Sequence, residues 1–197
     1  MLTLVREALR EQLAQAVVLA ELHASGDPRL LDQVGEWLAR GEKKMQDLRR
    51  TEAASLAAVR ARFGAGREGQ RDPEISADLS PRKALRTLAA LAIGRGEQTL
   101  RESLAAIDAR LQPLQAQMVQ LVSAAHLFGL VGSAPEESHE AWLRALWGRL
   151  GSHEKTRGMH TYLSAALPLI DRLYLLDEVV GNLMSQPEQL SSHGLVS

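Results

Sequence analysis

The sequence predicts an all-α protein, a helical bundle of about five to seven helices. Leucine is the commonest apolar residue, with 34 copies against 15 of valine and isoleucine together, and only seven of the 197 residues are aromatic. Valine, isoleucine and the aromatic residues favour strands, so the side chains that strands need are scarce. No run of alternating apolar and polar residues is bounded by turn residues, which also argues against a sheet.

A regular apolar repeat that begins at Leu100 predicts coiled-coil-like heptad packing. Such a repeat keeps one stripe of a helix facing a partner helix. Pro113 lies inside the repeat, and we expect a kink there because proline removes one backbone hydrogen bond and clashes with the preceding turn. The members occupy a and d positions of four heptads: Leu100, Leu104, Ile107, Leu111, Leu114, Met118, Leu121, Ala125 and Phe128.

Cap and turn residues place the helix boundaries in the first half of the chain. Asp27-Pro28 and Ser80-Pro81 each combine an N-cap residue with a proline at the first helical position, so each opens a helix. We expect the helix opened by Asp27 to reach Phe63. Gly35 and Gly41 predict a bend or break within it, because each glycine costs about 1 kcal/mol of helix stability relative to alanine.

Further helix starts and stops lie in the second half. The stretch Ser133–Glu136 has the pattern of a capping box, with serine at the N-cap and glutamate three residues on. We expect the helix that follows to end at Leu150, with Gly151 as its left-handed stop. The final helix, over residues 153–185, is apolar almost all round and is expected in the middle of the bundle, kinked at Pro168.

These boundaries divide the chain into four parts. Residues 1–63 form an N-terminal helical hairpin, and residues 80–185 form a C-terminal helical bundle that we expect to pack with the hairpin as one domain. Residues 64–79 contain three glycines, a proline and six charged residues, a composition typical of a flexible loop or linker. Residues 186–197 form a polar tail.

Composition and charge exclude several classes of protein. The chain has 45% hydrophobic and 24% charged residues and a net charge of -1, close to the average of soluble globular proteins. The absence of cysteine excludes disulfide scaffolds, thiolate zinc sites and cysteine nucleophiles. No apolar run is long enough to span a membrane, so we expect a cytoplasmic protein with no membrane partner. The excess of arginine over lysine, with many alanines and leucines, suggests a GC-rich bacterial genome.

One short motif, Glu136-x-x-His139, has the spacing of metal ligands. A glutamate and a histidine three residues apart lie on one face of a helix, and such pairs bind iron in carboxylate-bridged bundles. Those sites need a second pair, and the sequence has none. Because a capping role explains Glu136 better, we predict no metal-binding, catalytic or cofactor-binding residue. A small helical enzyme or metal protein that uses Glu136 and His139 stays as an alternative.

Basic residues are concentrated between Arg40 and Arg95. This segment holds thirteen lysines and arginines against seven acidic residues, whereas residues 133–197 hold five against eight. Arginine suits phosphate contacts, so a helical protein that binds nucleic acid is an alternative. Single-stranded sites usually interleave aromatic residues, and Phe63 is the only one here, so a solvated helix face is the simpler interpretation. The basic groups are Arg40, Lys43, Lys44, Arg49, Arg50, Arg60, Arg62, Arg67, Arg71, Arg82, Lys83 and Arg86.

The heptad repeat, the segregated charge and the lack of a catalytic motif together predict a non-catalytic helical interaction protein. It would be an adaptor, a scaffold or a small subunit of a larger bacterial assembly, and would pack its helices against a protein partner or a second copy of itself. Two tryptophans five residues apart point to different faces of a helix, which makes one of them a candidate contact residue. The candidate partner-binding residues are Leu100, Leu104, Leu111, Trp142 and Trp147.

Overall fold

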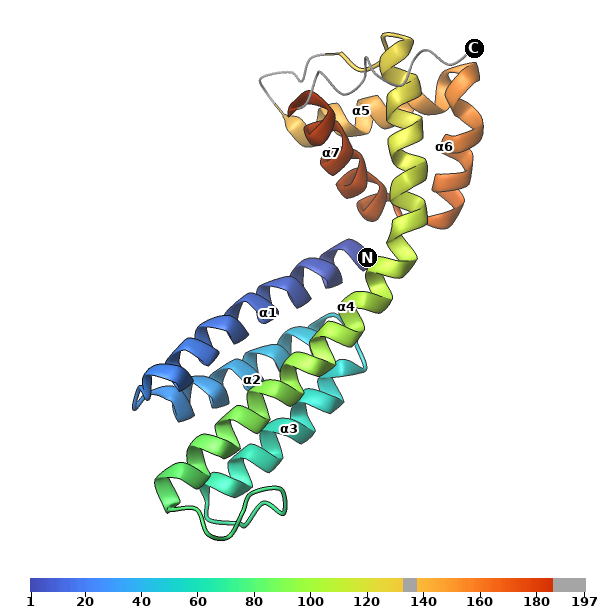
Figure 1. Ribbon diagram of the computed structural model, residues 1–197. Coiled ribbons are helices and arrows are strands. Elements are labelled where there is room, and N and C mark those ends of the chain that lie inside the picture. Colours follow the sequence, from blue (N-terminus) through green and yellow to red (C-terminus); the bar gives the residue numbers. More distant parts are fainter. Residues whose placement is uncertain (133–137, 186–197) are drawn as a thin grey trace, which may run out of the picture. The chain divides into compact units, whose positions relative to one another are not determined.

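The computed structural model describes residues 1–132 and 138–185, which form seven α-helices and no strand (Figure 1). The predicted all-α bundle of five to seven helices is confirmed, whereas its coiled-coil-like heptad packing stays a prediction. The predicted capping box at 133–136 and the tail at 186–197 lie outside the described residues. None of the described helices is both long and apolar enough to cross a membrane. The helices are α1 (Leu2–Ser25), α2 (Leu30–Asp47), α3 (Glu52–Arg67), α4 (Pro81–Leu127), α5 (His139–Ser152), α6 (Glu154–Ala166) and α7 (Leu169–Ser185).

The single helix predicted from Asp27-Pro28 to Phe63 is two helices, because the chain breaks at residues 48–51, between α2 and α3. The first of the two also begins later than predicted, at Leu30, with Arg29 and not Asp27 as its N-cap. Arg49 adopts the left-handed conformation, with φ of 54°, and the next amide donates a hydrogen bond back to the carbonyl of Met45 at 2.8 Å. This arrangement closes the C-terminus of α2. Gly35 and Gly41, where we expected the bend or break, both lie inside the continuous helix α2.

Proline fixes the ends of other helices. The helix α4 begins at Pro81, as the Ser80-Pro81 pair predicts, and it continues without a break through Pro113. Pro168 separates α6 from α7, because Leu167 before it is extended (φ −130°, ψ 141°), as the residue before a proline prefers. The single helix predicted over residues 153–185 is therefore two helices.

The corner between α5 and α6 differs from the prediction. Gly151 is not a stop: α5 extends beyond it, and His153 is the N-cap of α6. The hydroxyl of Thr156 donates to the carbonyl of Leu150 at 2.6 Å, which satisfies one of the free carbonyls at the end of α5. Gly151 is needed for space instead, since a β-carbon there would lie 2.7 Å from the ring of His160.

Contacts divide the chain into two compact units, and the division falls within α1 and α4. The N-terminal unit is Val5–Ile107, and the C-terminal unit combines Met1–Leu4 with Asp108–Ser197. In the N-terminal unit, the indole of Trp37 is buried and its Nε1 donates to the carbonyl of Gln12 at 3.0 Å. The other large side chains at the centre of this unit include Leu9, Val34, Leu38, Met45, Leu56 and Leu100.

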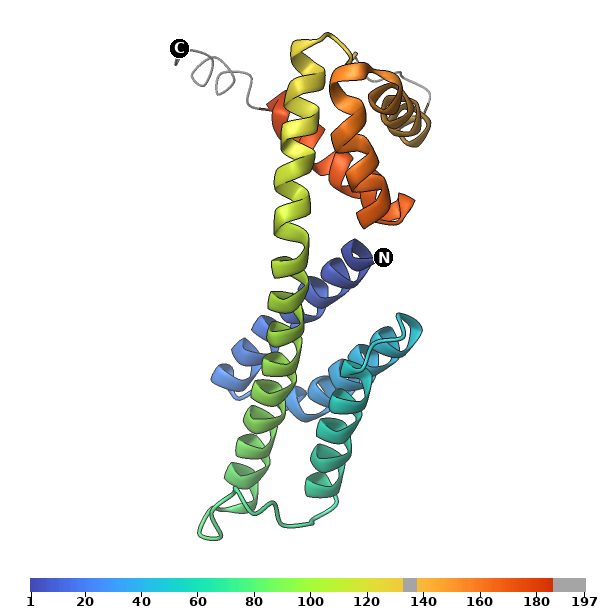
Figure 2. The ribbon, with the colours of Figure 1, turned by 90° about the vertical axis from the view of Figure 1, so that its right-hand side faces the viewer.

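In the C-terminal unit, α5, α6 and α7 contact one another (Figure 2). Most of the buried side chains of this unit are apolar. A buried carboxylate, Asp171 in α7, accepts hydrogen bonds from the amides of Leu2 and Thr3 at 2.9 and 3.1 Å and from the Thr3 hydroxyl at 2.6 Å. The amino group of Met1 lies 2.7 Å away. Burial acts to raise the pKa of Asp171, but these donors together outweigh it, so the pKa is lowered. The core side chains include Met118, Leu121, Leu146, Leu150, Leu163 and Leu176.

Candidate functional site

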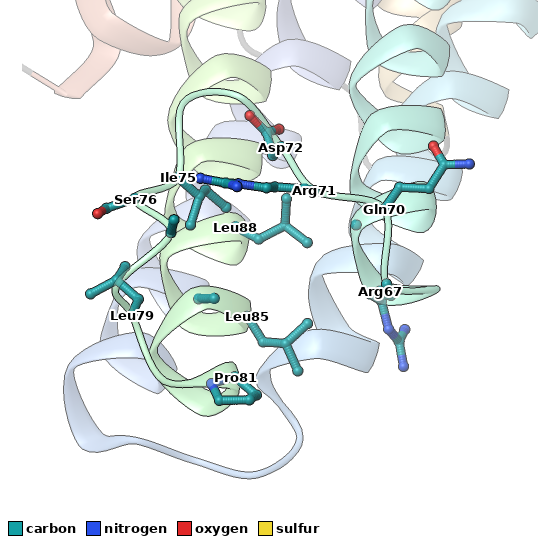
Figure 3. Close-up of a pocket in the computed structure, with 14 residues that line it drawn as sticks. Arg67, Gln70, Arg71, Asp72, Ile75, Ser76, Leu79, Pro81, Leu85 and Leu88 are labelled. Carbon is teal, nitrogen blue, oxygen red and sulfur yellow. The ribbon is translucent and has the colours of Figure 1, made fainter.

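The N-terminal unit contains a cavity of about 380 Å³ between the end of α3, the loop 68–80 and the first turns of α4 (Figure 3). We call it the α3–α4 cavity. Figure 3 shows Leu85 and Leu88 projecting from α4 toward the space that the loop encloses. Ile75 and Leu79 add apolar side chains from the loop itself. The arrangement is that of a binding site, in which an apolar lining carries a few polar groups.

Charged contacts hold the loop in place. The carboxylate of Asp72 is buried and accepts hydrogen bonds from the guanidinium of Arg62. It also accepts a hydrogen bond of 3.0 Å from the backbone amide of Glu74. The bonds from Arg62 lower the pKa of Asp72 to about 2. The carboxylate of Glu74 contacts Arg62 at 3.1 Å and also pairs with Arg95 of α4. The loop therefore connects α3 and α4 through ion pairs, and Ile75 is buried beneath it.

Glycine brings α3 and α4 close together at the cavity. A β-carbon at Gly66 would lie 2.5 Å from Leu88, so a larger residue there would displace this wall. Gly66 lies within α3, which extends to Arg67, and the connecting loop is thus shorter than the predicted 64–79 segment. The lack of a side chain at Gly66 sets the position of Leu88 in the lining.

A second cavity, of about 420 Å³, adjoins the first at the turn between α1 and α2. We call it the turn cavity. Pro28 and Leu30 line it from the turn and α2, and Arg82 and Arg86 line it from α4. Leu85 is the residue that lines both cavities, so the two apolar spaces share one wall residue.

The carboxylates that line these cavities are neutralised. Asp72 is paired with Arg62, and Asp27 accepts two hydrogen bonds from the guanidinium of Arg29, at 2.8 and 3.1 Å. The hydrogen bonds from Arg29 lower the pKa of Asp27 to about 2. Both groups are therefore ionised and matched by a cation at neutral pH.

Three lining arginines have no carboxylate partner among the described residues. Arg71 and Arg82 form no ion pair, and Arg86 donates to the backbone carbonyl of His23. Figure 3 shows the side chain of Arg71 reaching across the α3–α4 cavity toward Ile75. Arg67, the fourth lining arginine, is paired with Asp32 at 2.8 Å. The two cavities thus carry uncompensated positive charge beside apolar walls.

Half of the twelve predicted phosphate-binding groups form ion pairs within the fold. Six of them have carboxylate partners: Arg40 with Glu36, Lys44 with Glu11, Arg50 with Glu52, Arg60 with Glu42, Arg62 with Asp72 and Arg67 with Asp32. Within the described ranges, Lys43, Arg49 and Lys83 form no ion pair, like Arg71 and Arg82. The structure brings Arg67, Arg71, Arg82 and Arg86 together around the two cavities. The nucleic-acid alternative stays a prediction, with six of its twelve cations lacking a carboxylate partner among the described residues.

The predicted partner-binding residues lie mainly inside the fold. Leu100 and Leu111 are each 1% exposed, and Trp142 and Trp147 are each 6% exposed. Leu104 is half-buried. The ring of Trp147 contacts His160, with centroids 4.4 Å apart, and the guanidinium of Arg172. The apolar surface available to a partner is therefore formed by other residues.

The predicted pair of metal ligands is only partly described. Glu136 lies outside the described residues, whereas the Nε2 atom of His139 lies 2.6 Å from the Oδ1 atom of Asp177. Both side chains are more than half exposed. Across residues 1–132 and 138–185, no group of three or more histidines and carboxylates is arranged to hold a metal ion.

The lining residues Ile75, Leu79, Leu85 and Leu88 were not predicted as a site. One signal was present in the sequence, because Ile75 and Leu79 are the two large apolar residues of a mostly polar and charged loop. Comparisons of the chain with family models, with curated proteins and with solved structures gave no match.

Proposed function

We propose that the protein is a non-catalytic helical interaction protein, an adaptor or a small subunit of a larger bacterial assembly. It acts by holding a segment of a protein partner at the α3–α4 cavity. The proposal places it in the cytoplasm, as its composition favours. Binding, and not chemistry, is the task that this site suits.

One observation carries the proposal. An apolar cavity opens on the surface beside an ion-paired loop, and the guanidinium of Arg71, which lines this cavity, forms no ion pair with the part of the chain that the structure describes. A cavity with an apolar lining and a few polar groups usually marks a binding site. The ion pairs of Asp72 and Glu74 keep the loop in one conformation, which lowers the entropic cost of binding. The cavity is therefore pre-organised for a ligand.

Site-specific photo-crosslinking in native cells tests this proposal. Benzoylphenylalanine is introduced at Gln70 or Ser76, two exposed residues that line the cavity. The control position is Ser55, which is exposed at the opposite end of α3. We expect one discrete crosslinked protein from the two cavity positions and none from Ser55. The same adducts from all three positions, or none from Gln70 and Ser76, would contradict the proposal.

A further inference from the structure

We propose that the partner segment is acidic and leucine-rich, and that it fills the α3–α4 cavity and the turn cavity together. This inference rests on the proposed function and adds the chemistry of the partner. Three features of the two cavities carry it: a shared apolar wall, uncompensated arginines, and polar side chains suited to a peptide backbone.

The apolar walls indicate two side-chain sockets in a row. Leu85 lines both cavities, and the volume of each cavity exceeds that of one leucine or phenylalanine side chain. Successive apolar anchors of one segment fill such neighbouring sockets. Leu88 forms the wall of the first socket and Leu30 that of the second.

The charges around the sockets indicate acidic residues between those anchors. Asp72 and Asp27 are already paired with arginines, so they repel an incoming carboxylate little. Arg71 and Arg82 have no such partner among the described residues, and each lines one cavity. Two acidic residues, Glu68 and Asp78, are near in sequence, but neither lines a cavity. Charge complementarity therefore favours a negatively charged occupant.

Polar wall groups favour a protein segment over a lipid. The exposed amide of Gln70 and the hydroxyl of Ser76 line the α3–α4 cavity and can exchange hydrogen bonds with a peptide backbone. The acyl chains of a lipid have no group that could bond to this amide or this hydroxyl. The same arginines do attract anionic headgroups, so a lipid is an explicit outcome of the test.

The test measures binding of a designed probe to the full chain by fluorescence anisotropy. The probe is a capped peptide of about fifteen residues with leucine at every third or fourth position and glutamate between them. A matched peptide has lysine in place of glutamate, and vesicles of phosphatidylglycerol form a third arm. We expect the glutamate peptide to bind, with affinity that falls as salt rises, and the lysine peptide not to bind.

Variants assign the binding to the cavities. We expect the double variant Arg71→Glu, Arg82→Glu to weaken binding of the glutamate peptide about tenfold or more. The control variant Lys43→Glu reverses an exposed charge on α2 that lines neither cavity and has no ion-pair partner within residues 1–132 and 138–185. We expect it to change binding less than about twofold. We expect both variants to stay folded because all three cations are exposed, and circular dichroism checks this.

Other outcomes overturn the inference. Equal binding of both peptides, equal loss in the Lys43→Glu control, or binding to phosphatidylglycerol vesicles alone would each refute an acidic protein segment. If crosslinks form at Gln70 and Ser76 but the glutamate peptide does not bind, the chemistry assigned to the partner is wrong and the proposed function stands. If no crosslinks form there, the proposed function itself fails.

Discussion

Replacing Asp171 with asparagine should destabilise the C-terminal unit strongly. The carboxylate is 0% exposed and accepts three hydrogen bonds from the first turn of α1, besides its contact with the amino group of Met1. In Asp171→Asn, an NH2 group replaces one of the two carboxylate oxygens. This group donates hydrogen bonds and cannot accept them, so a backbone N–H that bonded to that oxygen loses its acceptor. The charge that favours the positive end of α1 is also lost.

The size of the effect follows from these contacts. A hydrogen bond to a charged group contributes about 1.5–3 kcal/mol, and removing one partner of a buried charged pair costs about 3–5 kcal/mol. Because the asparagine oxygen keeps some of the donors, we expect a loss of about 3 kcal/mol. The matched control is Asp177→Asn on the same helix, whose carboxylate is 51% exposed. It should change the stability by less than about 0.5 kcal/mol.

Urea denaturation, monitored through the hydrogen exchange of peptides from α7, measures this loss of stability in the C-terminal unit itself. The pH dependence gives a second readout. The pKa of Asp171 is lowered in the folded state, so its contribution is complete above the unfolded value of 3.8 and is lost as pH falls through the lower folded value. Asp171→Asn should remove this acid-dependent loss. A change below about 1 kcal/mol, or an unaltered pH profile, would refute the role assigned to the carboxylate.

Three further predictions concern packing, the loop and a histidine. Gly96→Ala should lower the stability by about 1–3 kcal/mol in thermal denaturation, because the new β-carbon would lie 2.6 Å from the ring of Trp37. The control Gly94→Ala has open space around it and should stabilise α4 by up to about 1 kcal/mol. Equal effects of the two variants would contradict this packing. Arg62→Gln should raise hydrogen exchange of the loop 68–80, because Asp72 and Glu74 lose their shared partner, and Arg60→Gln, which releases only Glu42, should not. The pKa of His160 is lowered by burial and by Arg172, so the C-terminal unit should lose stability as pH falls below the unfolded value of 6.5. His160→Gln should flatten that part of the urea-denaturation profile between pH 7.5 and 5, and an unchanged slope would exclude His160 as its source.

Helix type and several helix ends could be predicted from the sequence because their causes are local. The scarcity of strand-forming residues indicated an all-α fold, and Ser80-Pro81 marked the start of α4. Other boundaries depended on contacts that local patterns do not contain. Gly151, for example, is small because the His160 ring packs against it, and it does not end α5. A glycine thus has the same appearance in the sequence whether it serves a turn or close packing.

The candidate site could not be predicted because it depends on residues far apart in the chain. Distant residues decide which arginines form ion pairs. Arg67, for example, pairs with Asp32, which lies 35 residues away in the sequence. Leu85 becomes a shared wall only when the α1–α2 turn and the loop 68–80 meet the start of α4. The heptad repeat predicted Leu100 and Leu111 as partner-binding residues, but both side chains are buried within the fold.

Methyl NMR spectroscopy tests the central claim, that the α3–α4 cavity is the binding surface, most directly. Full-length protein with labelled isoleucine and leucine methyl groups is titrated with the glutamate peptide. We expect shifts at Ile75, Leu79, Leu85 and Leu88, and unchanged signals from Leu163 and Leu176 in the core of the C-terminal unit. Saturating shifts confined to other methyl groups, with those four unchanged, would contradict it.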